Sequence, residues 1–125
     1  MSQNSGTVLI VDDDAAVRSS LKFALEVEGF QVRLYDGAAA LLADRALPPR
    51  GCLVVDYRMP FVDGLELIET LRARNVVMPA ILITGRANGQ LRSRAAKSGI
   101  RSVLEKPLSD GTLVESIRSA LETCS

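Results

Sequence analysis

Histidine is absent from this chain of 125 residues, and cysteine occurs only at Cys52 and Cys124. Without histidine the chain cannot form a serine–histidine–aspartate triad, and most kinds of zinc site are excluded. A phosphohistidine is excluded for the same reason. If phosphoryl chemistry is involved, a partner must supply the group.

Net charge and long apolar runs are missing as well. Fifteen acidic residues balance fifteen basic ones, so no global attraction to nucleic acid or to an anionic membrane exists. No apolar run approaches the roughly 18 residues of a membrane-spanning helix, and residues 1–6 contain no signal-peptide core. We therefore expect a cytoplasmic protein without direct membrane or nucleic-acid contact, in which Cys52 and Cys124 stay thiols.

The composition that remains is that of an ordinary globular protein, with 47% hydrophobic and 24% charged residues. A chain of this length can bury a substantial core. No internal repeat, low-complexity tract or linker interrupts the sequence. These observations predict a single domain over residues 1–125.

Short apolar runs alternate with segments whose apolar residues recur every three to four positions, which predicts five strands and five helices. Asp14 is the expected N-cap of the first helix, and Gly29 its end. The expected strands are 7–11, 31–35, 53–56, 80–83 and 102–105, and the expected helices are 15–28, 38–46, 65–74, 86–98 and one capped by Ser109 or Asp110.

This alternation predicts an α/β fold, a parallel sheet with helices on both faces. The first, third and fourth strands are mostly apolar, as expected of strands covered on both faces, whereas the second and fifth are half polar. The half-polar strands are therefore expected at the edges of the sheet. That arrangement is the flavodoxin-like order 2-1-3-4-5 in a three-layer αβα sandwich.

Polar side chains follow four of the expected strands: Asp12 and Asp13, Asp56, Thr84 and Lys106. The carboxyl ends of parallel strands share one edge, so these side chains are expected to meet. Crowded carboxylates raise one another's pKa unless a cation joins them, and Mg²⁺ suits such oxygen ligands. A carboxylate beside a metal, a lysine and a hydroxyl is suited to forming an aspartyl phosphate. Each residue alone is better interpreted as a cap or surface group, but together they indicate a site.

Over essentially its whole length the chain resembles the receiver domains of bacterial two-component response regulators, and within them the FixJ group. Residues 56–64 and 79–85 carry much of this likeness. The matching positions are Asp12 and Asp13 for the acidic pair, Asp56 for the phosphoacceptor, Thr84 for the switch hydroxyl and Lys106, followed by Pro107, for the active-site lysine.

The resemblance implies a CheY-like fold and Mg²⁺ held by Asp13, Asp56 and the backbone carbonyl of Arg58, with Asp12 acting through water. It implies a cis bond before Pro107. It also implies that a sensor histidine kinase phosphorylates Asp56 and that the resulting switch controls an output domain or partner that acts in transcription. The only catalysis implied is the chain's own phosphorylation and dephosphorylation.

Two positions depart from the family pattern. Val103 stands where many receivers have a tyrosine or phenylalanine that swings inward on activation, and Leu108 stands where the FixJ group usually has phenylalanine. The alternative function is therefore a pseudo-receiver, a phosphorylation-independent interaction module. A flavin-binding protein is disfavoured because acids occupy the strand ends, and a dehalogenase-type phosphatase because Arg58 replaces its second acid.

Two groups of basic residues lie near the expected site, and the role of each group has two interpretations. Arg58 and Arg86 either shield the phosphoryl group from water or lie in solvent. The basic run around the fourth helix is either a solvated face or a partner surface, such as a homodimer through the fourth helix and fifth strand. The run comprises Arg86, Arg92, Arg94, Lys97 and Arg101.

Overall fold

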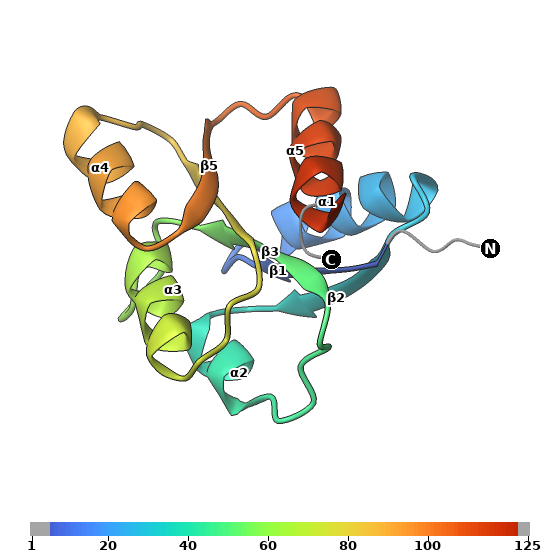
Figure 1. The fold of residues 1–125 in the computed structure, drawn as a ribbon. Helices are drawn as coiled ribbons and strands as arrows, with labels where there is room; N and C mark the ends of the chain where they lie inside the picture. Colours follow the sequence, from blue (N-terminus) through green and yellow to red (C-terminus); the bar gives the residue numbers. More distant parts are fainter. Residues whose placement is uncertain (1–5, 123–125) are drawn as a thin grey trace.

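A computed structural model describes residues 6–122 of the chain, apart from the side chain of Asp110. Five parallel strands form one sheet in the order β2-β1-β3-β4-β5, which confirms the predicted topology (Figure 1). The elements are β1 (Thr7–Val11), α1 (Ala15–Val27), β2 (Gln31–Tyr35), α2 (Ala38–Ala43), β3 (Gly51–Asp56), α3 (Gly64–Ala73), β4 (Ala80–Thr84), α4 (Gly89–Lys97), β5 (Ile100–Glu105) and α5 (Asp110–Glu122).

Helices cover both faces of the sheet, so the molecule has three layers. Figure 1 shows α1 and α5 on one side and α2, α3 and α4 on the other. Side chains of β1 alternate between the two cores: Val8 and Ile10 pack toward α1 and α5, and Leu9 and Val11 toward α2 and α3. The predicted αβα sandwich is confirmed. Its central strands are apolar except at their ends, as expected of strands that are covered on both faces.

Burial falls from the centre of the sheet to its edges. All residues of β3 and β4 are buried, whereas β2 and β5 are partly exposed. Strand pairing also lengthens two strands relative to the prediction. Gly51 pairs with Thr7, and Ile100 pairs with Ala80, so β3 and β5 begin before their purely apolar segments.

Capping side chains set the helix starts. The carboxylate of Asp14 accepts hydrogen bonds from the N–H groups of Ala16 and Val17, as predicted for an N-cap. Asp63 and Glu66 form a capping box at the start of α3. Such caps satisfy backbone donors that a helix leaves without partners.

Two predicted helices are shorter in the structure. Helix α4 begins at Gly89 rather than Arg86, because the side chain of Asn88 accepts from the N–H of Leu91 at 2.8 Å and caps the helix there. Helix α2 ends at Ala43 rather than residue 46, because Asp44 is extended and its carboxylate accepts from the N–H of Ala46 at 2.8 Å.

Within residues 6–122, no helix combines the length and apolarity that crossing a membrane requires. Cys52 is buried in β3, next to the apolar core between the sheet and helices α1 and α5. Cys124 lies outside the described residues, so the expectation that both cysteines stay thiols remains a prediction.

Candidate functional site

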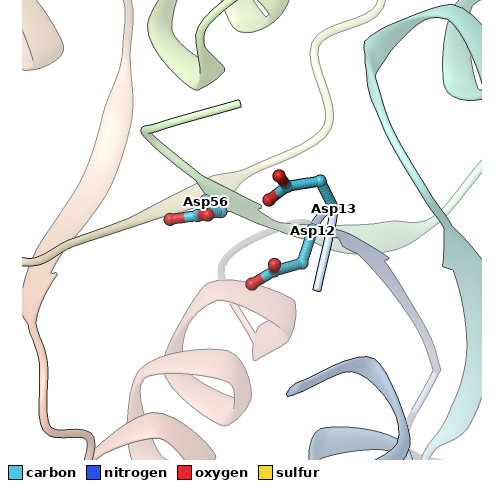
Figure 2. A group of neighbouring side chains, drawn as sticks. All are labelled: Asp12, Asp13 and Asp56. Carbon is cyan, nitrogen blue, oxygen red and sulfur yellow. The ribbon is translucent and has the colours of Figure 1, made fainter. Parts of the chain in front are cut away.

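Three carboxylates meet at the carboxyl edge of the sheet (Figure 2). Asp12 and Asp13 follow β1, and Asp56 ends the neighbouring strand β3, which is in register with β1. One carboxylate oxygen from each residue lies within 4.8 Å of the others. Asp12 and Asp56 are buried, and Asp13 is exposed. The structure thus brings together the three acids that the sequence places at adjacent strand ends.

Burial dominates the electrostatics of this cluster. It raises the pKa of Asp56, an effect that the ammonium of Lys106 and the backbone N–H of Arg58 oppose. Burial likewise raises the pKa of Asp12, and the nearby charge of Asp56 adds to it, while the N–H of Asp14 opposes both. The cluster favours an added positive charge, and its oxygen donors fit a hard divalent cation such as Mg²⁺.

Lys106 provides a positive charge from a third strand end. Its ammonium nitrogen lies 3.4 Å from Oδ1 of Asp56, and its side chain is 40% exposed. The N–H of Lys106 donates to the carbonyl of Thr84 at 2.8 Å, which holds the ends of β4 and β5 together. The bond between Lys106 and Pro107 is cis, as the resemblance implies.

Thr84 ends β4 and is buried. Its hydroxyl donates to the carbonyl of Arg86 at 3.1 Å and accepts from the N–H of the same residue at 3.3 Å. The hydroxyl is thereby engaged in the turn that leads to α4. A new acceptor at Asp56 would have to compete with this local bond.

Gly64 permits the close packing of α3 against the phosphoacceptor strand, a role that the sequence analysis did not assign. Its N–H donates to the carbonyl of Tyr57 at 2.8 Å. A Cβ at this position would collide with the backbone oxygen of Asp56 and lie 2.9 Å from Cγ1 of Val55. An Asp-Gly pair such as that at 63–64 indicates a turn, but the sequence does not reveal how closely two backbones approach.

Two further side chains support the site and were also missed. Arg18 of α1 donates to the carbonyl of Asp12 at 2.7 Å. Glu105, the last residue of β5, accepts from the N–H of Ala87 at 2.7 Å and so ties β5 to the loop that contains the Thr84 turn. Neither role has a local sequence signal, since each contact joins two elements.

The basic residues flanking the site share one surface. Arg58 and Arg86, from the loops after β3 and β4, line a hollow of about 530 Å³ beside α4. Its other lining residues are Tyr57, Asn88, Gln90, Leu91, Ser93, Arg94 and Lys97. Val103 lies half-buried on β5 and packs against the core on the α4 side.

The fold and the cluster together define the class of protein: a flavodoxin-like α/β domain with an acidic site at the carboxyl edge of its sheet. Comparison with known families gives the particular identity. The chain belongs to the response regulator receiver domain family, whose model matches residues 8–118. Domains of this family are phosphorylated by histidine kinases.

Individual relatives agree with this assignment. The transcriptional regulatory protein FixJ of Azorhizobium caulinodans is 44% identical over 115 residues, which cover 91% of this chain and 54% of that protein. The C4-dicarboxylate transport transcriptional regulatory protein DctD of Pseudomonas aeruginosa is 37% identical over 92% of this chain and 25% of that protein. The chain thus spans about half of the FixJ relative and a quarter of DctD.

Solved structures show the same fold. The crystal structure of FixJ-N superposes with a TM-score of 0.82 at 38% identity, covering 98% of this chain and 96% of the other. Full-length FixJ from B. japonicum gives a TM-score of 0.87 at 39% identity, covering 98% of this chain and 61% of the other.

Proposed function

We propose that residues 1–125 act as one phosphoacceptor domain in which Asp56 takes a phosphoryl group from a sensor histidine kinase. The observation that carries this proposal is the set of groups around Asp56. The ammonium of Lys106 lies 3.4 Å away, and the carboxylates of Asp12 and Asp13 share the same edge. A structural role alone would not explain three crowded acids at two neighbouring strand ends, two of them buried.

Asp12, Asp13, Asp56 and the backbone carbonyl of Arg58 would hold Mg²⁺, which when bound would neutralise charge developing on the transferred phosphoryl group. The chain's own residues do the rest. A carboxylate oxygen of Asp56 forms the new bond to phosphorus as the bond to the donor histidine breaks. Lys106 pairs with a phosphoryl oxygen, because its ammonium already faces the same carboxylate.

The switch follows from the bonds that Thr84 makes now. A phosphoryl oxygen on Asp56 gives the Thr84 hydroxyl a charged acceptor, which competes with the carbonyl of Arg86. The turn before α4 then rearranges, and α4 and β5 carry the change to a transcriptional output domain or partner. The chain acts as a switch in this scheme and processes no substrate other than its own phosphoryl group.

The partners of the switch are a cytoplasmic kinase domain, which has access to ATP, and a second copy of this chain that binds through α4 and β5. Supporting the second partner, β5 is an edge strand, and the basic residues Arg92, Arg94 and Lys97 on α4 are exposed. Burying such a surface between two copies requires acidic or polar counterparts.

An NMR titration with beryllofluoride, a mimic of the phosphoryl group, tests the proposal. Amide signals of Thr84, Lys106 and α4 should shift only when Mg²⁺ is present as well. The Asp56→Asn variant should show no such shift. If the wild-type spectrum does not respond to beryllofluoride with Mg²⁺, the domain is a pseudo-receiver and the proposal is wrong.

A further inference from the structure

Among the large hydrophobic residues of the described region, only Phe61 is both exposed and held at a positive φ. Its side chain is fully exposed, at 104% of the reference area, and its backbone φ is +72°. Exposed apolar side chains are common and need no explanation by themselves. Four other large hydrophobic side chains in the described region are exposed, but each has a negative φ: Phe23, Val27, Leu34 and Val77.

The backbone at Phe61 is strained. The N–H of Val62 donates to the carbonyl of Pro60 at 2.8 Å, so Phe61 is the central residue of a γ-turn with positive φ, the rare and strained form. Asn75 also has a positive φ of 65°, but asparagine tolerates that conformation. A bulky aromatic residue does not, and the exposed ring of Phe61 gains no packing in return.

The strained turn lies at the edge of the sheet that carries Asp56. The loop over residues 57–63 leaves β3 directly after Asp56, and the hydrogen bond from Gly64 N–H to the carbonyl of Tyr57 closes it at its base. Tyr57, Met59 and Pro60 line an open hollow of about 570 Å³ in this loop. A protein that brings a phosphohistidine to Asp56 must approach across this edge.

We propose that the ring of Phe61 is an anchor that the phosphodonor kinase buries when it docks over Asp56. This inference rests on the proposed function and adds the residue that recognises the donor protein. Aromatic side chains supply large contact areas at interfaces and often dominate the binding energy. A small donor such as acetyl phosphate reaches Asp56 without covering Phe61, so the two kinds of donor separate docking from chemistry.

The test compares both donors on matched variants of the chain. Phe61→Gly removes the ring and relieves the positive φ, Phe61→Asn replaces the ring with a residue suited to that φ, and Phe61→Tyr keeps an aromatic ring. Val77→Ser removes an exposed apolar side chain from the loop before β4, at the opposite edge of the sheet. The protein donor is the autophosphorylated core of a histidine kinase chosen because it phosphorylates the wild-type chain.

The glycine and asparagine variants should lower kcat/KM for transfer from the kinase about tenfold or more. Phe61→Tyr and Val77→Ser should transfer like wild type, and all variants should react normally with acetyl phosphate. Thermal midpoints of the glycine and asparagine variants should not fall, which separates lost docking from lost folding. Wild-type kcat/KM with the kinase for Phe61→Gly, or equal losses with both donors, would overturn the inference. A wild-type chain that acetyl phosphate does not modify contradicts the proposed function instead.

Discussion

At the scale of single residues, the chemistry depends on a carboxylate that the fold buries. The positive charge of the partly exposed Lys106 does not offset the burial of Asp56. The pKa of Asp56 is therefore raised. That the acids and Lys106 would meet could be predicted from sequence, because they follow parallel strands whose ends share an edge. The roles of Gly64 and Glu105 could not be predicted, because their contacts depend on the paths of the loops after β3 and β4.

Away from the site, Tyr35 and Asp44 form a pH-dependent pair. The Tyr35 hydroxyl donates to the Asp44 carboxylate, and this hydrogen bond is the main cause that lowers the pKa of Asp44 below 3.8. The hydrogen bond from the N–H of Ala46 lowers it further. Because the folded-state pKa is lowered, the stabilisation is complete above 3.8 and disappears as the pH falls through the folded-state value. Tyr35→Phe should therefore flatten this acid part of the stability profile.

Urea unfolding at pH values above and below 3.8 measures that profile. Tyr57→Phe serves as a control, because within residues 6–122 its hydroxyl has no carboxylate partner like Asp44. The prediction fails if Tyr35→Phe and wild type lose the same free energy of unfolding between the two pH ranges.

At the scale of elements, the type and order of all ten helices and strands could be predicted, but some boundaries could not. Periodicity identifies an element, whereas its ends depend on particular side chains. The carboxylate of Asp44 and the amide of Asn88 decide where α2 ends and α4 begins. Polar residues of this kind also occur inside helices, so the sequence alone did not show which of them act as caps.

Arg72 links three segments at the amino edge of the sheet. From α3 it donates to the carbonyls of Val76 at 3.0 Å and Met78 at 2.8 Å in the loop before β4, and to those of Ser98 at 3.1 Å and Gly99 at 3.5 Å after α4. A lysine cannot supply this planar set of donors. Arg72→Lys should lower the free energy of unfolding by about 2 kcal/mol.

The comparison for this prediction is Arg74→Lys, measured by the same urea unfolding. Arg74 is exposed and donates to a single carbonyl, that of Leu42, at 3.0 Å. Its replacement should cost less than about 0.5 kcal/mol. Similar losses for the two variants would show that the multiple hydrogen bonds of Arg72 have no special role.

At the scale of the whole molecule, a neutral chain contains a locally unbalanced acidic site. Burial and mutual repulsion raise the pKa of Asp12 and Asp56, so with the acids ionised the site opposes folding above those pKa values. Removing one charge with Asp13→Asn should therefore raise the thermal midpoint of the metal-free protein. The same change should weaken Mg²⁺ binding.

In thermal unfolding, addition of Mg²⁺ should reverse which of the two proteins, wild type or Asp13→Asn, has the higher midpoint. Without the ion Asp13→Asn is the more stable, and with Mg²⁺ at a hundred times its dissociation constant wild type gains about 2.7 kcal/mol. Glu115→Gln, a change on the exposed surface of α5, controls for the loss of an acidic charge. If Mg²⁺ stabilises wild type and Asp13→Asn equally, Asp13 is not a ligand of the metal.

Phosphorylation of Asp56 itself is the central claim, and intact-mass spectrometry after incubation with acetyl phosphate and Mg²⁺ measures it most directly. Wild type should gain the mass of one phosphoryl group, the gain should require Mg²⁺, and Asp56→Asn should show none. An Asp56→Asn variant that still gains that mass, or a wild-type chain that does not, would contradict the assignment of Asp56 as the phosphoacceptor.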